Sequence, residues 1–179
     1  MKMEENKKQT ILVSVSGGCV EKEIKDAILN LKRAGISPSF KPLILAILTR
    51  HDRLNFIPVI NLLEKYNFKV FDVTNRKANT GDSKLYGLAH EIYNRSINGY
   101  SLIEEINTIT NHYYRFTSFI NRIEELFDTG KGYYDWSGRK YFLFIYDQYL
   151  RKVNSTSTIA SELQWEDFVN KKSIEHILP

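Results

Sequence analysis

Residues 102–127, LIEEINTITNHYYRFTSFINRIEELF, decide the fold because their apolar side chains recur at one regular interval. Steps of four and three residues alternate along the stretch and connect Leu102, Ile106, Ile109, Tyr113, Phe116, Ile120, Ile123 and Phe127. This interval places the side chains in a seam along one face of an α-helix. It predicts one long helix over about 101–127, roughly 40 Å in length at a rise of 1.5 Å per residue.

Two further stretches, residues 43–48 and 141–150, are almost wholly apolar and predict buried helices. Together with the seam they predict a mainly α fold, an irregular multi-helix bundle around the long central helix. The seam itself has two interpretations, because it can pack inside the bundle or pair two copies of the chain into a homodimer. The other apolar helices can cover it, which favours packing inside the bundle.

Length and composition are those of an ordinary globular protein, with 179 residues of which 42% are hydrophobic and 26% charged. We expect an N-terminal tail or extended arm at 1–19, a helical bundle domain at 20–153, and a Ser/Thr-rich linker with the start of a further domain at 154–179. No apolar run approaches the ~18 residues of a membrane span, so no membrane partner is expected. Cys19 is the single cysteine, which fits a reducing, cytoplasmic location.

The net charge of +4, from 25 basic and 21 acidic residues, allows contact with DNA without requiring it. One loop interleaves aromatic side chains with basic ones, an arrangement that can stack bases and contact phosphates or can plug one end of the bundle. Its aromatic members are Tyr133, Tyr134 and Trp136, and the candidate DNA-binding residues are Lys131, Arg139 and Lys140, with Lys171 and Lys172 further along the chain.

A charged cluster, Arg50-His51-Asp52-Arg53, follows the first apolar stretch. It has two interpretations. The two arginines can clasp a phosphate group, or the cluster can be a solvated helix end whose cations face the negative end of the helix dipole. The second arrangement is the commoner one and is favoured here.

The sequence Ile174-Glu175-His176-Ile177-Leu178-Pro179 places an acidic residue directly before a histidine, with a proline three positions later. Many HNH nucleases open their catalytic hairpin in this way. In that chemistry the histidine accepts a proton from the attacking water, and the neighbouring carboxylate helps to hold a divalent metal. The alternative interpretation is a short apolar segment with an exposed Glu-His pair.

The residues that precede this motif extend the similarity. The stretches 140–151, 165–168 and 173–179 resemble the run into the HNH domain of the GmrSD-type restriction endonucleases, and 41–48, 68–71, 84–89 and 91–93 are similar to that family's middle region. The resemblance covers roughly residues 20–179. It also favours a helix at 68–73, where alternation of apolar and polar residues alone predicts a strand.

In that family a ParB-like domain hydrolyses nucleotide, and an HNH domain cuts DNA, often modified phage DNA. By resemblance, His176 is the general base and Glu175 a carboxylate on the metal side. This chain has neither the Asp-Gly-Gln-Gln-Arg motif of the first domain nor the Asn and further ligand that complete the second. We therefore expect no cofactor in this chain, with Mg²⁺ or Mn²⁺ and a nucleotide expected only in the full-length protein.

The resemblance thus implies an architectural role. The chain would be the helical connector of a phage-defence restriction nuclease, inactive alone, with DNA and the rest of the nuclease polypeptide as partners. Contacts to the DNA backbone would be an additional role. The alternative is a stand-alone helical protein-interaction module.

Overall fold

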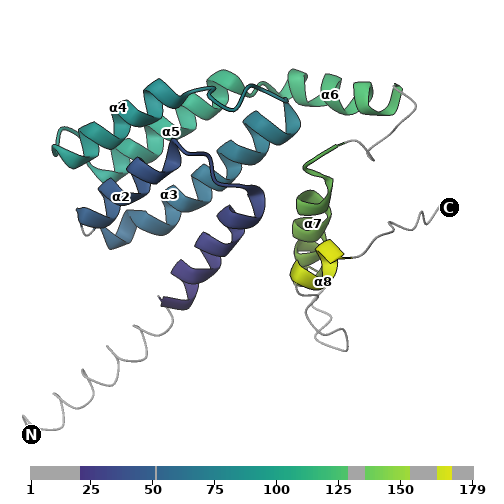
Figure 1. Cartoon of the computed structure of the whole chain (residues 1–179), viewed down its shortest axis with the longest axis horizontal. Coiled ribbons are helices and arrows are strands. Elements are labelled where there is room, and N and C mark those ends of the chain that lie inside the picture. Colours follow the sequence, from purple (N-terminus) through teal and green to yellow (C-terminus); the bar gives the residue numbers. More distant parts are fainter. Residues whose placement is uncertain (1–20, 51, 129–135, 154–164, 171–179) are drawn as a thin grey trace, which may run out of the picture. The chain divides into compact units, whose positions relative to one another are not determined.

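The structure is a computed structural model, and it describes residues 21–50, 52–128, 136–153 and 165–170. Every regular element in these ranges is a helix, which confirms the mainly α fold (Figure 1). The helices are residues 21–34, α2 (Phe40–Thr49), α3 (Arg53–Tyr66), the π-helix η1 (Asn67–Val73), α4 (Asp82–Tyr93), α5 (Gly99–Tyr113), α6 (Phe116–Asp128), α7 (Arg139–Val153) and α8 (Trp165–Asn170).

The described residues divide into two compact units, one up to Arg122 and one from Ile123. The boundary falls inside α6, whereas the sequence had suggested divisions after residues 19 and 153.

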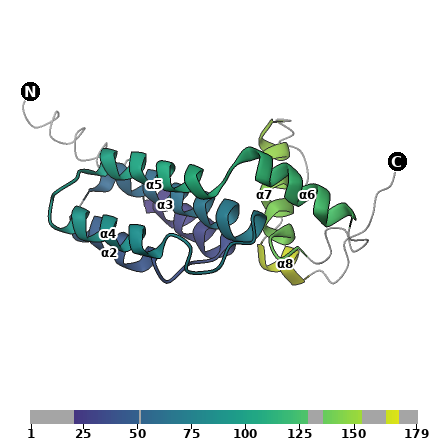
Figure 2. The ribbon, with the colours of Figure 1, turned by 90° about the horizontal axis from the view of Figure 1, so that it is seen from above.

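Two helical hairpins make up most of the first unit. Helices α2 and α3 form one hairpin and α4 and α5 the other, and α2 packs mainly against α4 while α3 packs against α5 (Figure 2). Residues 50 and 95–99, from the two hairpin turns, line one pocket and therefore lie at the same end of the unit. Helices α2 and α4 both end at this pocket. The turns of the two stacked hairpins therefore lie at the same end of the unit.

The core of the first unit lies between these hairpins and includes Ala27 and Leu31 from the helix of residues 21–34. Helix α2 contributes Phe40, Leu43, Ala46 and Ile47, all buried. The prediction that 43–48 is buried on all sides is wrong, because Leu45 is 62% exposed and Leu48 50%. Helix α2 is thus covered on one face only.

Helix α3 continues directly into the π-helix η1, so the expected helix at 68–73 is confirmed and the strand interpretation is wrong. The side-chain amide of Asn67 starts this segment and donates a hydrogen bond to the backbone carbonyl of Ala34. At its other end, the backbone N–H of Thr74 donates to the carbonyl of Lys69, a span of five residues. Residues Asn67, Val70 and Val73 are buried, which explains how tertiary packing holds this wider helix.

The single long helix predicted over 101–127 is broken into α5 and α6 at Tyr114, whose backbone is extended with φ −112° and ψ 112°. The seam is buried at Leu102, Ile106 and Ile109. After the break it leaves the core, because Phe116 is 69% exposed. The aromatic ring of Tyr114 has a packing partner of its own, since the ammonium group of Lys69 lies 4.7 Å from its centroid.

The second unit joins α7 to α8. The ring of Phe144, on the inner face of α7, contacts Trp165 at 5.1 Å between centroids and Phe168 at 5.8 Å. Residues 141–150 of α7 were predicted to be buried because this stretch is almost wholly apolar. Its Tyr141 and Phe144 are buried, but three further aromatic side chains are exposed, so the helix has one covered face.

Candidate functional site

The predicted nuclease residues cannot be placed from the structure. Glu175 and His176 lie outside the described residues, as do three of the five predicted DNA-binding residues, namely Lys131, Lys171 and Lys172. Tyr133 and Tyr134 also lie outside them. Their roles therefore stay predictions from the sequence.

The other two predicted DNA-binding residues begin α7 and make contacts within the second unit. The Lys140 ammonium group donates a hydrogen bond of 2.6 Å to the carbonyl of Val169 in α8. The Arg139 guanidinium donates to the carbonyl of Trp136 at 3.2 Å. Trp136 is buried against Phe142, as expected if it fills a hydrophobic gap. Both basic residues therefore make hydrogen bonds within the second unit. A contact of either residue with DNA stays a prediction.

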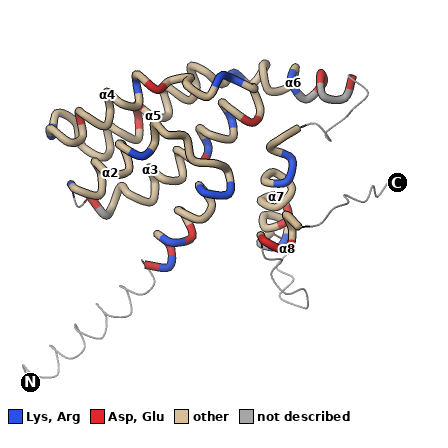
Figure 3. The backbone as a smooth tube through the Cα atoms, in the orientation of Figure 1, with Lys and Arg blue, Asp and Glu red and all other residues tan. Residues whose placement is uncertain are grey.

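Charge is spread over the helices. Lys and Arg, and Asp and Glu, are scattered along the described chain among a majority of other residues (Figure 3). Among the described residues, no three His, Cys, Asp or Glu side chains are grouped so as to hold a metal ion.

None of the described helices has the length and apolar character needed to cross a membrane.

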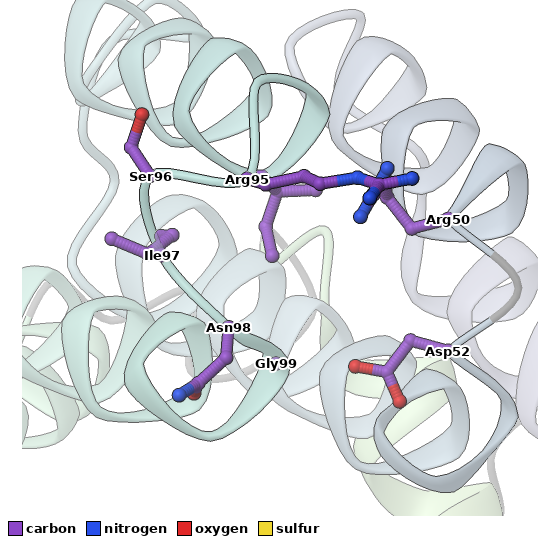
Figure 4. Close-up of a pocket in the computed structure, with 8 residues that line it drawn as sticks. Arg50, Asp52, Arg95, Ser96, Ile97, Asn98 and Gly99 are labelled. Carbon is purple, nitrogen blue, oxygen red and sulfur yellow. The ribbon is translucent and has the colours of Figure 1, made fainter.

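A pocket of about 530 Å³ opens where the turns of the two stacked hairpins meet (Figure 4). The α2–α3 turn contributes Arg50 and Asp52, and the α4–α5 connection contributes residues 95–99, with Ile92 from the end of α4. The side chains of Arg50 and Arg95 extend toward one another across it (Figure 4). This pocket is the candidate functional site.

Arg95 follows the end of α4 and has a strained backbone conformation. Its φ is +62°, in the left-handed region that glycine usually occupies at a helix end. Two hydrogen bonds close the turn in the pattern of a Schellman motif, from the N–H of Ser96 to the carbonyl of Glu91 at 2.9 Å and from the N–H of Arg95 to the carbonyl of Ile92 at 3.2 Å. A left-handed non-glycine residue costs about 1–2 kcal/mol.

The acidic group in the pocket is already engaged. Asp52 caps α3, and its carboxylate accepts from the backbone N–H of Asn55 at 3.3 Å and from its side-chain amide at 2.9 Å. A side chain at Gly99 would bring its Cβ within 2.2 Å of Asp52 Oδ2. The carboxylate therefore lies directly against the first residue of α5, which explains why this position holds glycine.

Neither arginine is neutralised inside the described structure. Among its residues, no carboxylate forms an ion pair with Arg50 or Arg95, and no acceptor takes a hydrogen bond from either guanidinium group. Arg50 was recognised as charged from the sequence, but only together with Arg53. Its partner in the pocket is Arg95, which no local pattern indicates because it comes from the other hairpin.

The π-helix carries two perturbed ionisable groups. Burial raises the pKa of the Asp72 carboxyl to about 6. Burial, together with the nearby charge of Lys65, lowers the pKa of Lys69. Both residues lie on η1, away from the residues that line the pocket.

No protein-family model matches this chain, and no curated protein or solved structure is significantly similar to it.

Proposed function

We propose that this chain is the helical connector region of a GmrSD-like DNA restriction nuclease with a role in phage defence. The observation that carries the proposal is the Glu175-His176 pair followed by Pro179, in the sequence context that resembles the approach to an HNH domain. In this role the chain is architectural. It holds a nucleotide-hydrolysing domain and a DNA-cutting domain in one polypeptide and passes movement between them.

The packing of the second unit supports this role. Helix α8 is fixed to α7 by the rings of Trp165 and Phe168 against Phe144, and by the hydrogen bond from Lys140 to Val169. Asn170 ends α8, and only residues 171–174 separate it from Glu175. In the proposed role, the catalytic pair therefore follows closely along the sequence on an element that is packed onto α7.

The first unit supplies the stiffness that a connector needs. Its two hairpins are stacked around a continuous core that extends from Ala27 to Ile109. A close-packed interior of this kind moves as one body instead of deforming gradually. It is therefore suited to transmitting a displacement.

The reading frame after the codon for Pro179 tests the proposal. We expect it to encode an Asn and a further His or Asn ligand within a hairpin-and-helix segment. The polypeptide extended through that segment should cleave DNA in the presence of Mg²⁺ or Mn²⁺, and His176→Ala should abolish cleavage. An extended protein without such a segment, or with cleavage that His176→Ala leaves unchanged, would contradict the proposal.

A second candidate, a helical protein-interaction module, is favoured by one feature of α7. Its exposed aromatic side chains form a row in which Phe142 stacks on Tyr146 at 6.0 Å and Tyr146 on Tyr149 at 6.5 Å between ring centroids. Aromatic side chains are enriched at protein interfaces. On this reading the row pairs two copies of the chain.

A further inference from the structure

We propose that the pocket between the two hairpin turns binds a phosphate group, held by the guanidinium groups of Arg50 and Arg95. This inference rests on the first unit alone and is independent of the nuclease proposal. The ligand chemistry is a tetrahedral oxyanion, carried either by free phosphate or by the phosphodiester backbone of nucleic acid.

The first argument is electrostatic. Two guanidinium groups extend into one pocket, and the described residues offer neither of them an ion-pairing carboxylate (Figure 4). Like charges held close together are unfavourable unless a counter-charge lies between them. The planar donors of arginine match the oxygens of phosphate in a two-pronged geometry. A phosphate between Arg50 and Arg95 would satisfy both groups at once.

The second argument is the conformation of Arg95. Glycine would meet the left-handed φ of +62° without strain, yet the position carries a long cationic side chain directed into the pocket. Strained backbone of this kind is concentrated at functional sites, where the side chain has a task that offsets the cost. The task available to Arg95 in this pocket is to bind an anion.

Asp52 is the one acidic side chain among the residues that line the pocket. Its carboxylate accepts hydrogen bonds from Asn55, as the cap of α3, and lies against Gly99. The other groups along the pocket are hydrogen-bond donors or neutral. They include the hydroxyl of Ser96 and the first turn of α5, whose backbone N–H groups favour negative charge. The side-chain oxygen of Asn98 already accepts from the N–H of Ser101, which leaves its NH₂ group as a donor.

The test uses the whole chain and follows the Nε–Hε signals of the arginines by ¹H–¹⁵N NMR during titration with inorganic phosphate, at constant ionic strength maintained with chloride. We expect saturable shifts for Arg50 and Arg95. Arg95→Gly and Arg50→Gln should each weaken binding by roughly tenfold or more, as expected for the loss of a hydrogen bond to a charged group. Arg76→Gln removes the same charge from an exposed position outside the pocket and should leave binding unchanged.

Thermal unfolding separates this role from a structural one. Arg95→Gly should unfold at the same or a higher temperature than the parent chain in chloride, because it relieves the left-handed strain. Saturating phosphate should stabilise the parent chain but not Arg95→Gly. If Arg95 serves only the fold, Arg95→Gly will lower the unfolding temperature in chloride, and that result would overturn the proposal.

A second arm titrates a short DNA duplex in place of phosphate. Shifts of the same two signals at lower concentrations than phosphate requires would assign the ligand to the nucleic-acid backbone, provided that Arg95→Gly removes them. Shifts with phosphate alone would assign it to a free phosphate group. If neither probe shifts these signals, or if Arg76→Gln weakens binding as much as Arg95→Gly does, the pocket is not a phosphate site.

Discussion

The hydroxyl of Tyr66 donates a hydrogen bond of 2.8 Å to the backbone carbonyl of Thr80. This contact fixes the end of α3 to the connection that leads into α4. The ring of Tyr66 is fully buried and meets Phe40 and Phe71 edge to face, at 5.8 and 5.7 Å between centroids. Burial, with smaller effects from Tyr113 and Asp82, raises the pKa of Tyr66 far above its usual value. The phenol therefore stays a hydrogen-bond donor at every ordinary pH.

Gly81 is predicted to be essential for this arrangement. Its φ is +80°, and an added Cβ would lie 2.1 Å from the Tyr66 hydroxyl. Gly81→Ala should therefore lower the free energy of unfolding by about 2–4 kcal/mol, from backbone strain and overpacking together. Gly87→Ala is the matched control, because Gly87 is an exposed position inside α4 with open space around it. It should stabilise the chain by about 0.5–1 kcal/mol. Urea denaturation measures both, and equal effects would contradict the prediction.

Asn67 is predicted to hold the helix of residues 21–34 to the π-helix. Asn67→Ala would leave the carbonyl of Ala34 without its hydrogen bond in a buried place and should cost about 1–3 kcal/mol. Asn61→Ala changes an exposed residue of α3 and should alter stability by less than about 0.5 kcal/mol. Hydrogen exchange should also show faster exchange across residues 21–34 in Asn67→Ala. Unchanged exchange there would show that the contact does not hold this helix.

Asp72 is predicted to make stability depend on pH. Its pKa is about 6 in the folded chain and 3.8 in a model peptide, so the folded state binds the proton more tightly. The proton on the buried carboxyl therefore stabilises the folded state. This contribution to the free energy of unfolding is complete below about pH 4 and is lost as the pH rises through 6. The loss should be on the order of 1–2 kcal/mol after allowance for solvent screening.

Denaturation between pH 4 and 7 measures this contribution. Asp72→Asn should remove the fall in stability over that range, whereas Asp26→Asn, at an exposed position, should leave it in place. A parent chain whose stability rises steadily from pH 4 to 7 would contradict the assignment to Asp72.

The aromatic row on α7 separates the two candidate functions. If Phe142, Tyr146 and Tyr149 pair two copies of the chain, light scattering after size exclusion will give a dimer at high concentration. Replacing Tyr146 and Tyr149 by Ser, where both are exposed, would then give a monomer without loss of helical content. The connector account gives this row no role in pairing and expects the same oligomeric state with and without the two replacements. A dimer that this double variant dissociates would favour the interaction module.

The mainly α fold and the burial of Leu102, Ile106 and Ile109 follow from the sequence because helical periodicity is a local property. The break at Tyr114 does not follow from it. The apolar interval continues past this residue, and the chain leaves the helix where Tyr114 has an aromatic-cation partner in Lys69. A contact between residues so far apart along the chain leaves no periodic signal.

For the same reason, the sequence predicts only part of the candidate site. Arg50 stands in a charged cluster that the sequence singles out, but its partner Arg95 lies in a second hairpin. Asn98 caps α5 and Gly99 is its first residue, so two further pocket residues also come from the second hairpin. The backbone strain at Arg95 is invisible without coordinates, because arginine is not a residue that predicts a left-handed turn.

The most direct test of the connector account is a plasmid-nicking assay with the 179-residue chain in Mg²⁺ or Mn²⁺, beside its His176→Ala variant. The account predicts no metal-dependent nicking by either protein, because one carboxylate and one imidazole do not complete a catalytic metal site. General-base catalysis alone contributes only ~10²–10⁴-fold, too little to cut DNA. Nicking by the chain that disappears in His176→Ala would contradict the account, since it would make this chain a nuclease in its own right.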